Sequence, residues 1–276
     1  MTMPVVDTHA HIFHRSLKFS PGRRYEPNYD ATLAGFLRQL DANGVTQGVL
    51  VQPSFLGTDN SYLLAALREQ PARLRGVVVI QPTLSWGELT GLAAAGVVGI
   101  RLNLMGAELP DLRAVSWRTL LERLVQIDWF VDVQCEARDL PLVVAPLLAA
   151  GVKVVVDHFG RPDPRLGVND PGFRHLLSVG HTRRVWVKLS GAYRNGSGAA
   201  GEALAAAAVP LLCEAFGAER LLWGSDWPHA QFETVASYAA ARAQFERWIT
   251  NPADHAAILG GGPTTLHRFG PAGSQR

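Results

Sequence analysis

The sequence predicts one α/β domain of the (β/α)₈ class, in which eight parallel strands form a barrel enclosed by helices. Three observations support this fold. Eight short runs rich in valine, isoleucine and leucine recur along the 276 residues, and they are nearly continuously apolar, as strands buried on both faces should be. Alanine- and leucine-rich segments with helical spacing alternate with these runs. The alternation extends over about 230 residues, which is close to the usual size of a TIM barrel.

The predicted strands follow one another at regular intervals. They occupy residues 4–9, 46–52, 75–82, 97–104, 129–135, 152–159, 185–191 and 220–227. The clearest helices are predicted at residues 30–44, 60–70, 117–126 and 202–217. Asp30 is the expected N-cap of the first helix, and Gly44 is the glycine expected just after its C-terminal end.

A doubly wound open sheet is the structural alternative. Such a sheet usually carries a glycine-rich phosphate loop after an early strand, and this sequence has none. No stretch rich in proline, glycine or serine divides the chain, so residues 1–276 are predicted to form a single domain. The segment at 195–201, NGSGAAG, is expected to be a mobile loop after the seventh strand.

Composition argues against several classes of partner. The formal net charge is +2 and lysine and arginine form no stripe, so neither nucleic acid nor an anionic membrane is expected to bind. No signal peptide is visible, and no run of about 18 or more apolar residues predicts a membrane span. Cys135 and Cys213 have no partner nearby in the sequence and are expected to be buried free thiols. A cytoplasmic protein is therefore expected, and the sequence leaves monomer and homodimer open.

Polar side chains occur at the predicted C-terminal ends of many strands, where a barrel of this class places its active site. Each would be costly to bury alone, and a random scatter would not place so many at the same end. The set consists of His9, His11, Ser54, Arg101, Gln134, Glu136, Asp157, His158, Arg194, Asp226 and His229.

Taken singly, these residues have ordinary structural explanations. His158 could be a hydrogen-bonded core residue, and Asp226 could cap a helix. Arg101, inside an apolar strand, needs an anion that is either a protein carboxylate or a ligand, and the sequence leaves both open. His9 and His11 point to the same side of a strand because they are two residues apart. The combination of three histidines and one aspartate at three strand ends indicates a functional site.

Three segments carry a resemblance to a known family. DTHAH at 7–11, VVVDHFGRP at 154–162 and LLWGSDWPH at 221–229 resemble, in this order, the amidohydrolase-related branch of the amidohydrolase superfamily. Within this branch the chain more closely resembles the lactonases that hydrolyse 2-pyrone-4,6-dicarboxylate. The closer resemblance rests on FSPGRRY at 19–25, SFLGTDN at 54–60, GIRLNL at 99–104 and KLSGAYR at 188–194.

This resemblance implies a division of roles. Asp226 would be the general base that activates water for ester hydrolysis. The lactone carbonyl would be polarised, and the resulting oxyanion stabilised, by His9, His11 and His158. Carboxylate groups of the substrate would be bound by Tyr25, Ser54, Arg101, Gln134 and Arg194.

The chain departs from the lactonase pattern at three positions. Ala107 stands where the pattern has a second arginine after Arg101, and Gln134 replaces a tyrosine. Loss of one charge-assisted bond to a carboxylate costs about 1.5–3 kcal/mol, which is enough to change substrate choice within one reaction class. Gly262 replaces an asparagine, and this change is interpreted as structural.

The same polar set is competent to bind a single Zn²⁺, with His9, His11, His158 and Asp226 as ligands. By resemblance, a binuclear site would need a carboxylated lysine or a glutamate on the fourth strand and a histidine on the fifth. The chain has Arg101 and Gln134 there instead. The charge of Arg101 also disfavours a cation. A hydrolase without a cofactor is therefore expected, with one zinc ion as the alternative.

The sequence thus predicts an enzyme, a lactonase that hydrolyses a small anionic lactone similar to 2-pyrone-4,6-dicarboxylate in the degradation of aromatic compounds. A sugar-acid lactonase or lactone isomerase of the same branch is the alternative, because the missing arginine and tyrosine leave room for hydroxyl-rich substrates. A decarboxylase of the wider branch, which would need a metal, is a more distant alternative. A non-catalytic barrel that binds an anion would keep Arg101 and Arg194 but has no reason to keep Asp226 with three histidines.

Overall fold

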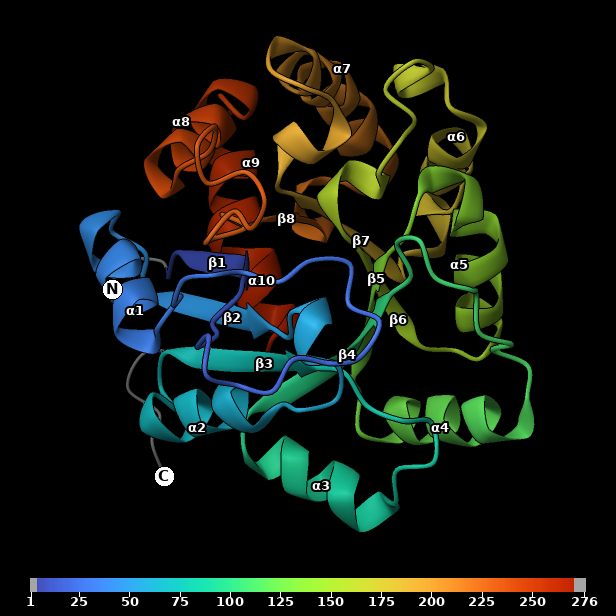
Figure 1. The fold of residues 1–276 in the computed structure, drawn as a ribbon. Helices are drawn as coiled ribbons and strands as arrows, with labels where there is room; N and C mark the ends of the chain where they lie inside the picture. The colour runs from blue at the N-terminus through green and yellow to red at the C-terminus, as the bar shows by residue number, and fades with distance from the viewer. Residues whose placement is uncertain (1–3, 271–276) are drawn as a thin grey trace.

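The computed structural model describes residues 4–270 and confirms the predicted (β/α)₈ barrel (Figure 1). The strands are parallel, and strands that are consecutive in the sequence are neighbours in the sheet. They are β1 (Val6–Ala10), β2 (Gln47–Val51), β3 (Leu74–Val78), β4 (Val97–Asn103), β5 (Phe130–Gln134), β6 (Lys153–Val156), β7 (Val185–Leu189) and β8 (Leu221–Trp223). Residues 1–3 and 271–276 of the predicted domain lie outside the described residues.

All eight predicted strands are present, although most are shorter than their apolar runs. One such difference is at β3, which ends at Val78 although the run continues to residue 82. Beyond this point the side chain of Asn60 replaces the neighbouring strand. Its Nδ2 donates to the carbonyl oxygen of Val79 at 2.9 Å, and its Oδ1 accepts from the Val79 backbone N–H at 3.1 Å.

The first and last strands meet at the C-terminal end of the barrel. The backbone N–H of Asp226 donates to the carbonyl oxygen of His9 at 2.8 Å, and the N–H of His11 donates to the carbonyl oxygen of Trp227 at 2.7 Å. Ala10 and Trp227 form a parallel bridge between these two bonds. The hydrogen bonds that link β1 to the segment after β8 therefore also bring residues 9–11 next to residues 226–227.

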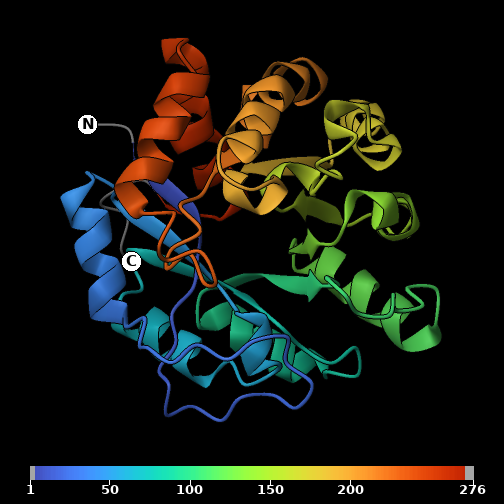
Figure 2. The same cartoon turned by 45° about the horizontal axis from the view of Figure 1, so that its top comes forward.

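Helices follow the strands and lie outside the barrel in both views (Figure 1, Figure 2). They are α1 (Leu33–Ala42), α2 (Ser61–Glu69), α3 (Trp86–Ala94), α4 (Val115–Gln126), α5 (Leu140–Ala149), α6 (Pro171–Ser178), α7 (Ala199–Phe216), α8 (Tyr238–Trp248), α9 (Pro252–Ala256) and α10 (Gly262–Leu266). The predicted N-cap of α1 is wrong. Thr32 caps this helix, since its hydroxyl accepts from the N–H of Gly35, while Asp30 accepts from the N–H of Arg15. Gly44 follows the C-cap with a φ of +64°, as predicted.

The glycine-rich segment at 195–201 differs from the prediction. Helix α7 begins at Ala199, so the last three residues of the expected loop are helical. Gly201 lies inside this helix, where a Cβ would stand 2.5 Å from the carbonyl oxygen of Ala192. Close packing of the helix on the preceding turn, rather than mobility, explains this glycine.

Helix α7 is the one helix within residues 4–270 that is long and apolar enough to cross a membrane by those two criteria. Its residues Leu204, Ala208 and Leu212 are buried in the core between the barrel and its helices. This packing accounts for the apolar residues on the buried face of α7. The expected absence of a membrane partner stays a prediction.

The interior of the barrel changes from apolar to charged along its axis. Val6 and Phe130 form an apolar layer with Leu266 near the N-terminal ends of the strands. Two residues along a strand return to the same side, so Asp132 follows Phe130 on β5 and Lys188 follows Trp186 on β7. The side chains of Asp132 and Lys188 lie above the apolar layer, and both are fully buried. The barrel therefore encloses a charged layer between its apolar base and its open end.

Candidate active site

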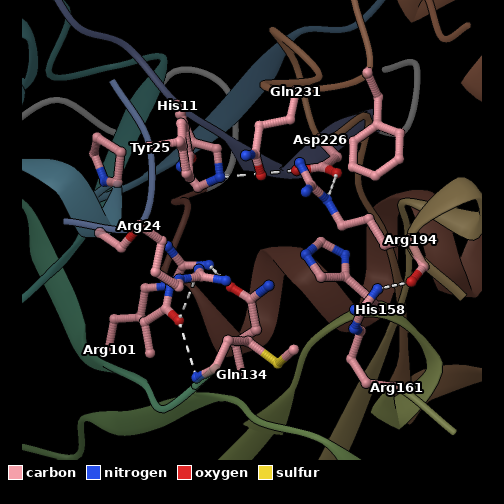
Figure 3. A pocket seen from close by; sticks show the side chains of 15 residues that line it. His11, Arg24, Tyr25, Arg101, Gln134, His158, Arg161, Arg194, Asp226 and Gln231 are labelled. Atoms are coloured by element: carbon pink, nitrogen blue, oxygen red, sulfur yellow. Dashed lines mark hydrogen bonds and ion pairs between the residues drawn. The ribbon is translucent and has the colours of Figure 1, made fainter. Parts of the chain in front are cut away.

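A cavity of about 130 Å³ lies at the C-terminal ends of the strands (Figure 3). Eight of the nine predicted site residues line it, and the ninth, His9, is fully buried beside it. The lining consists of His11, Arg24, Tyr25, Pro53, Ser54, Arg101, Asn103, Met105, Gln134, His158, Arg161, Arg194, Asp226, Gln231 and Phe232.

Asp226 uses its two carboxylate oxygens differently. Oδ2 accepts from the hydroxyl of Tyr193 at 2.6 Å and from Nε of Arg194. Oδ1 has no hydrogen-bond partner among residues 4–270 and lies 3.7 Å from His9 Nε2 and 3.8 Å from His11 Nε2. Burial alone would raise the pKa of Asp226, but the charge of Arg194 outweighs it and holds this pKa well below its usual range. Asp226 is therefore an ionised carboxylate with one oxygen free to accept a proton.

His11 is a neutral ring with a fixed proton. Its Nδ1 lies 2.6 Å from the carbonyl oxygen of Val51, which only accepts, so the ring donates its proton there. Burial and the charge of Arg101 lower the pKa of His11 to about 3. Nε2 consequently presents a lone pair toward Asp226. The resemblance assigned His11 a donor role at the carbonyl, whereas this geometry makes it a hydrogen-bond acceptor.

His9 lies deeper than His11, and its two nitrogens have different surroundings. Nδ1 accepts from Nζ of Lys188 at 3.0 Å and lies 3.2 Å from Asp157 Oδ1. Nε2 has no hydrogen-bond partner among the described residues and faces Asp226. Burial lowers the pKa of His9 well below its usual value, so this ring is also neutral.

His158 approaches the cavity from the end of β6. Its Nδ1 and the hydroxyl of Ser190 are 2.8 Å apart. Burial lowers the pKa of His158 to about 4, so a third neutral imidazole faces the site. Both His158 and Asp226 have a positive φ, of 51° and 60°. Residues in this left-handed region cost about 1–3 kcal/mol each and occur often at functional sites.

Tyr25 and Ser54 line the cavity, as predicted, from loops rather than strands. Ser54 begins a short 3₁₀ helix after β2. The ring of Tyr25 packs edge-on against Phe55, with centroids 5.2 Å apart. Burial raises the pKa of Tyr25, so its hydroxyl keeps its proton and can donate it.

Arg101 combines the two explanations that the sequence left open. One nitrogen donates to the carbonyl oxygen of Gln52 at 2.9 Å. The other donates to Gln134 Oε1 and lies 3.3 Å from Asp157 Oδ2. The guanidinium is therefore paired with a protein carboxylate and still forms part of the cavity wall.

Two further arginines in the lining were not predicted. Arg24 and Arg161 have no carboxylate within ion-pair distance in the described part of the chain. Figure 3 shows Arg24 beside Arg101 on one side of the cavity and Arg161 near Arg194 on the opposite side. Burial and the charge of Arg194 lower the pKa of Arg161 to about 10, which leaves it protonated at neutral pH. The lining thus holds four guanidinium groups against one carboxylate.

Two glycines allow the catalytic side chains to come together. A Cβ at Gly191 would lie 2.8 Å from Asp226 Oδ2 and 2.9 Å from His158 Nδ1. A Cβ at Gly224 would lie 2.5 Å from the Cβ of His9. Any larger residue at either position would therefore displace a candidate catalytic group.

The spacing of the site also suits a metal ion. His9, His11 and Asp226 each offer one donor atom, and these atoms all lie within 4.8 Å of one another; His9, Asp157 and His158 form a second group of this kind. Two nitrogens and one carboxylate oxygen are suitable ligands for Zn²⁺. The distances between donor atoms thus fit one ion, with His9 common to both groups.

The family follows from the whole chain. The model of the amidohydrolase family matches residues 6–269. The chain belongs to this family, and the predictions of the family and of an enzyme are confirmed.

Three curated relatives are acid-lactone or sugar-lactone enzymes by name. The 2-pyrone-4,6-dicarboxylate hydrolase of Comamonas testosteroni is 32% identical over 81% of this chain and 76% of its own length. The 4-sulfomuconolactone hydrolase of Rhizobium radiobacter is 31% identical over 82% of this chain and 76% of its own. The D-galactarolactone isomerase of Agrobacterium fabrum is 27% identical over 96% of this chain and 91% of its own length.

Two solved structures are similar over almost their full length. A structure described as a 2-pyrone-4,6-dicarboxylic acid hydrolase from Pseudomonas putida has a TM-score of 0.92 and 46% identity, covering 98% of this chain and 100% of the other. One with the same description from Acinetobacter baumannii, with citric acid bound, has a TM-score of 0.94 and 38% identity, covering 97% and 100%.

Proposed function

We propose that this chain hydrolyses a lactone that carries two acidic groups, such as 2-pyrone-4,6-dicarboxylate. The observation that carries the proposal is the pair of arginines without carboxylate partners, Arg24 and Arg161, on opposite sides of one small cavity (Figure 3). Two fixed positive charges in one site suit two carboxylates or similar anions. The names of the relatives support the same substrate class.

In the proposed reaction Asp226 is the general base. Water gives a proton to the free Oδ1 of Asp226, and its oxygen forms a bond to the lactone carbonyl carbon. The carbonyl electrons move onto oxygen, where N–H donors from His9 and His158 stabilise the negative charge. The C–O bond of the ring then breaks. The leaving oxygen takes the proton back from Asp226, which yields the open-chain acid.

The remaining predicted residues are proposed to bind the substrate. Arg101, Gln134 and Arg24 form one side of the cavity, where a carboxylate would receive N–H donors from two guanidinium groups (Figure 3). Tyr25 and Ser54 add hydroxyl donors. His11, which accepts at Nε2, is proposed to hold the second hydrogen of the attacking water.

We propose that this chemistry needs no cofactor. The guanidinium groups of Arg101 and Arg194 border the candidate metal position and repel a cation there. If one ion were bound, His9, His11 and Asp226 would hold it. It would supply Lewis-acid polarisation of the carbonyl and lower the pKa of a bound water.

The test is ring opening of 2-pyrone-4,6-dicarboxylate by the purified protein, followed by ultraviolet absorbance before and after treatment with a chelator. Turnover that survives chelation is expected. Asp226→Asn should lower kcat by roughly 100- to 10,000-fold, the range for loss of a general base, and leave substrate binding intact. Asp41→Asn, on the exposed surface of α1, is the matched control. Full activity of the Asp226→Asn variant would refute the assignment of the base.

A sugar-acid lactonase or lactone isomerase is the second candidate. Neutral hydrogen-bonding side chains also line the cavity, among them Asn103, Gln134 and Gln231. Amides of this kind bind hydroxyl groups, and one relative is named for a sugar-acid lactone. Turnover of sugar-acid lactones without turnover of the dicarboxylate would favour this function. No turnover of either substrate class would overturn both.

A further inference from the structure

A buried lysine beneath the cavity has no role in the mechanism above. Lys188 lies on β7 with no exposed surface, and its ammonium sits next to His9. We propose that Lys188 is a positioning residue that keeps the proton of His9 on Nε2, the nitrogen that faces Asp226. The proposal deepens, and rests on, the proposed hydrolysis.

The buried ammonium of Lys188 is surrounded by hydrogen-bond acceptors and negative charge. Nζ donates to His9 Nδ1 at 3.0 Å and to Asp132 Oδ2, and it lies 3.0 Å from Asp157 Oδ1. An ammonium group has three N–H donors and no acceptor, so each neighbour must offer a lone pair. His9 Nδ1 and Asp132 Oδ2 meet this requirement with hydrogen bonds, and Asp157 Oδ1 adds a second negative charge beside the ammonium.

This requirement fixes the tautomer of His9. If Nδ1 carried the proton, two donors would face each other at 3.0 Å, and one buried N–H of Lys188 would lose its partner. The rival acceptor for an Nδ1 proton is Asp157 Oδ1 at 3.2 Å, but this oxygen makes no aligned hydrogen bond with any described residue. The aligned bond at Nδ1 is the one from Lys188, so the proton belongs on Nε2.

The consequence is a division of labour between the two histidines of the N-terminal motif. The carbonyl of Val51 fixes the proton of His11 on Nδ1, so His11 accepts at Nε2. Lys188 fixes the proton of His9 on Nε2, so His9 donates there. His9 Nε2 and Asp226 Oδ1 are 3.7 Å apart, too far for a direct hydrogen bond but close enough for one bridging oxygen atom. Hydrolysis needs both a donor for the carbonyl oxygen and acceptors for the water hydrogens.

The same contact bears on metal binding. A ring nitrogen that carries a proton has no lone pair for a metal ion. As long as Lys188 donates to Nδ1, His9 is therefore unavailable as a ligand, although its distance to the other donor atoms fits one.

The direct test needs no substrate. In wild-type protein labelled with ¹⁵N in its histidines, long-range proton–nitrogen correlation spectra report which ring nitrogen carries the proton. A His9→Gln variant assigns the His9 signals. The expected result is a proton on Nε2 of His9 and on Nδ1 of His11. A proton on Nδ1 of His9 would overturn the proposal, whether or not the protein hydrolyses a lactone.

Variants then connect the tautomer with the reaction. Lys188→Met should move the His9 proton to Nδ1 and lower kcat on the order of 100-fold, as loss of one oxyanion donor does, with little change in KM. Lys153→Met, which removes a lysine paired with Asp128 at the surface, is the control and should change neither. The double variant Lys188→Met with Asp132→Asn also removes one of the two carboxylates left unpaired and should show the same tautomer change. A loss of activity with an unchanged His9 tautomer would assign Lys188 a merely structural role and refute the proposal.

Discussion

Gly191 provides a sharp test of the site geometry. In Gly191→Ala the new methyl group would stand 2.8 Å from Asp226 Oδ2 and 2.9 Å from His158 Nδ1. These distances are 0.6 and 0.5 Å shorter than 3.4 Å, the lower limit of ordinary contact. Both catalytic groups are held by tight hydrogen bonds, so the clash must displace at least one of them. A displacement of about 1 Å in an active site costs about 100-fold, so kcat should fall roughly 10- to 100-fold.

The control separates this displacement from backbone strain. Gly191 has a φ of +56°, and alanine in this left-handed region costs about 1–2 kcal/mol of stability. Gly44 has a φ of +64°, and a Cβ there would meet no atom within 4 Å. Gly44→Ala should therefore lose comparable stability in thermal denaturation but keep full kcat. If Gly191→Ala retained the activity of the Gly44→Ala variant, the inferred packing of Asp226 against His158 would be wrong.

Three further predictions follow from the charges in the site. Because His11 and His158 have pKa values of about 3 and about 4 when folded but 6.5 when unfolded, the unfolded chain binds protons that the folded chain rejects. The free energy of unfolding should fall as pH drops from about 6.5 to about 4, by up to about 1.4 kcal/mol per pH unit for each ring, and denaturant titrations with His158→Asn should show a shallower dependence. Arg24→Met and Arg161→Met should each raise KM for a dicarboxylated lactone by roughly 10- to 100-fold, because each removes an interaction of about 1.5–3 kcal/mol with a carboxylate. The KM for a singly charged lactone should rise in at most one of these two variants. Arg165→Met, at an exposed position, should change neither KM value. Extended dialysis against a chelator should leave kcat unchanged, and activity restored only by added Zn²⁺ would contradict the cofactor-free proposal.

The fold was predictable because its signals are local and repeated. Continuous apolar runs identify strands buried on both faces wherever they occur, and each predicted strand is present. The errors of the fold prediction occur where the hydrogen bonds of one side chain determine where a helix or strand begins or ends. Asn60 ends β3 by bonding to Val79, and Thr32 rather than Asp30 reaches the first free N–H groups of α1. Such choices depend on the path of the backbone, which residue preferences alone do not give.

The site was predictable where residues lie at strand ends and less so elsewhere. Barrel topology places strand C-termini together, which brought His11, His158 and Asp226 into the expected cavity. Arg24 and Arg161 belong to loops, whose paths the strand pattern does not determine. Lys188 had a readable signal that the sequence interpretation missed. A lysine in the middle of an apolar strand needs a buried anion, which is the argument already applied to Arg101.

The missing arginine of the lactonase pattern is the clearest case in which structure changes the meaning of a sequence difference. At position 107 this chain has alanine, which from sequence alone indicates one positive charge fewer around the substrate. In the structure, Cδ of Arg24 lies 3.9 Å from where a Cβ of the adjacent Gly106 would stand, and its guanidinium reaches toward Asn103 at 3.5 Å. A loop that precedes α1 thus brings Arg24, a residue of the cavity lining, next to Gly106. The alanine at position 107 therefore does not leave this part of the cavity without a guanidinium group, which is why we still propose a doubly acidic lactone as the substrate.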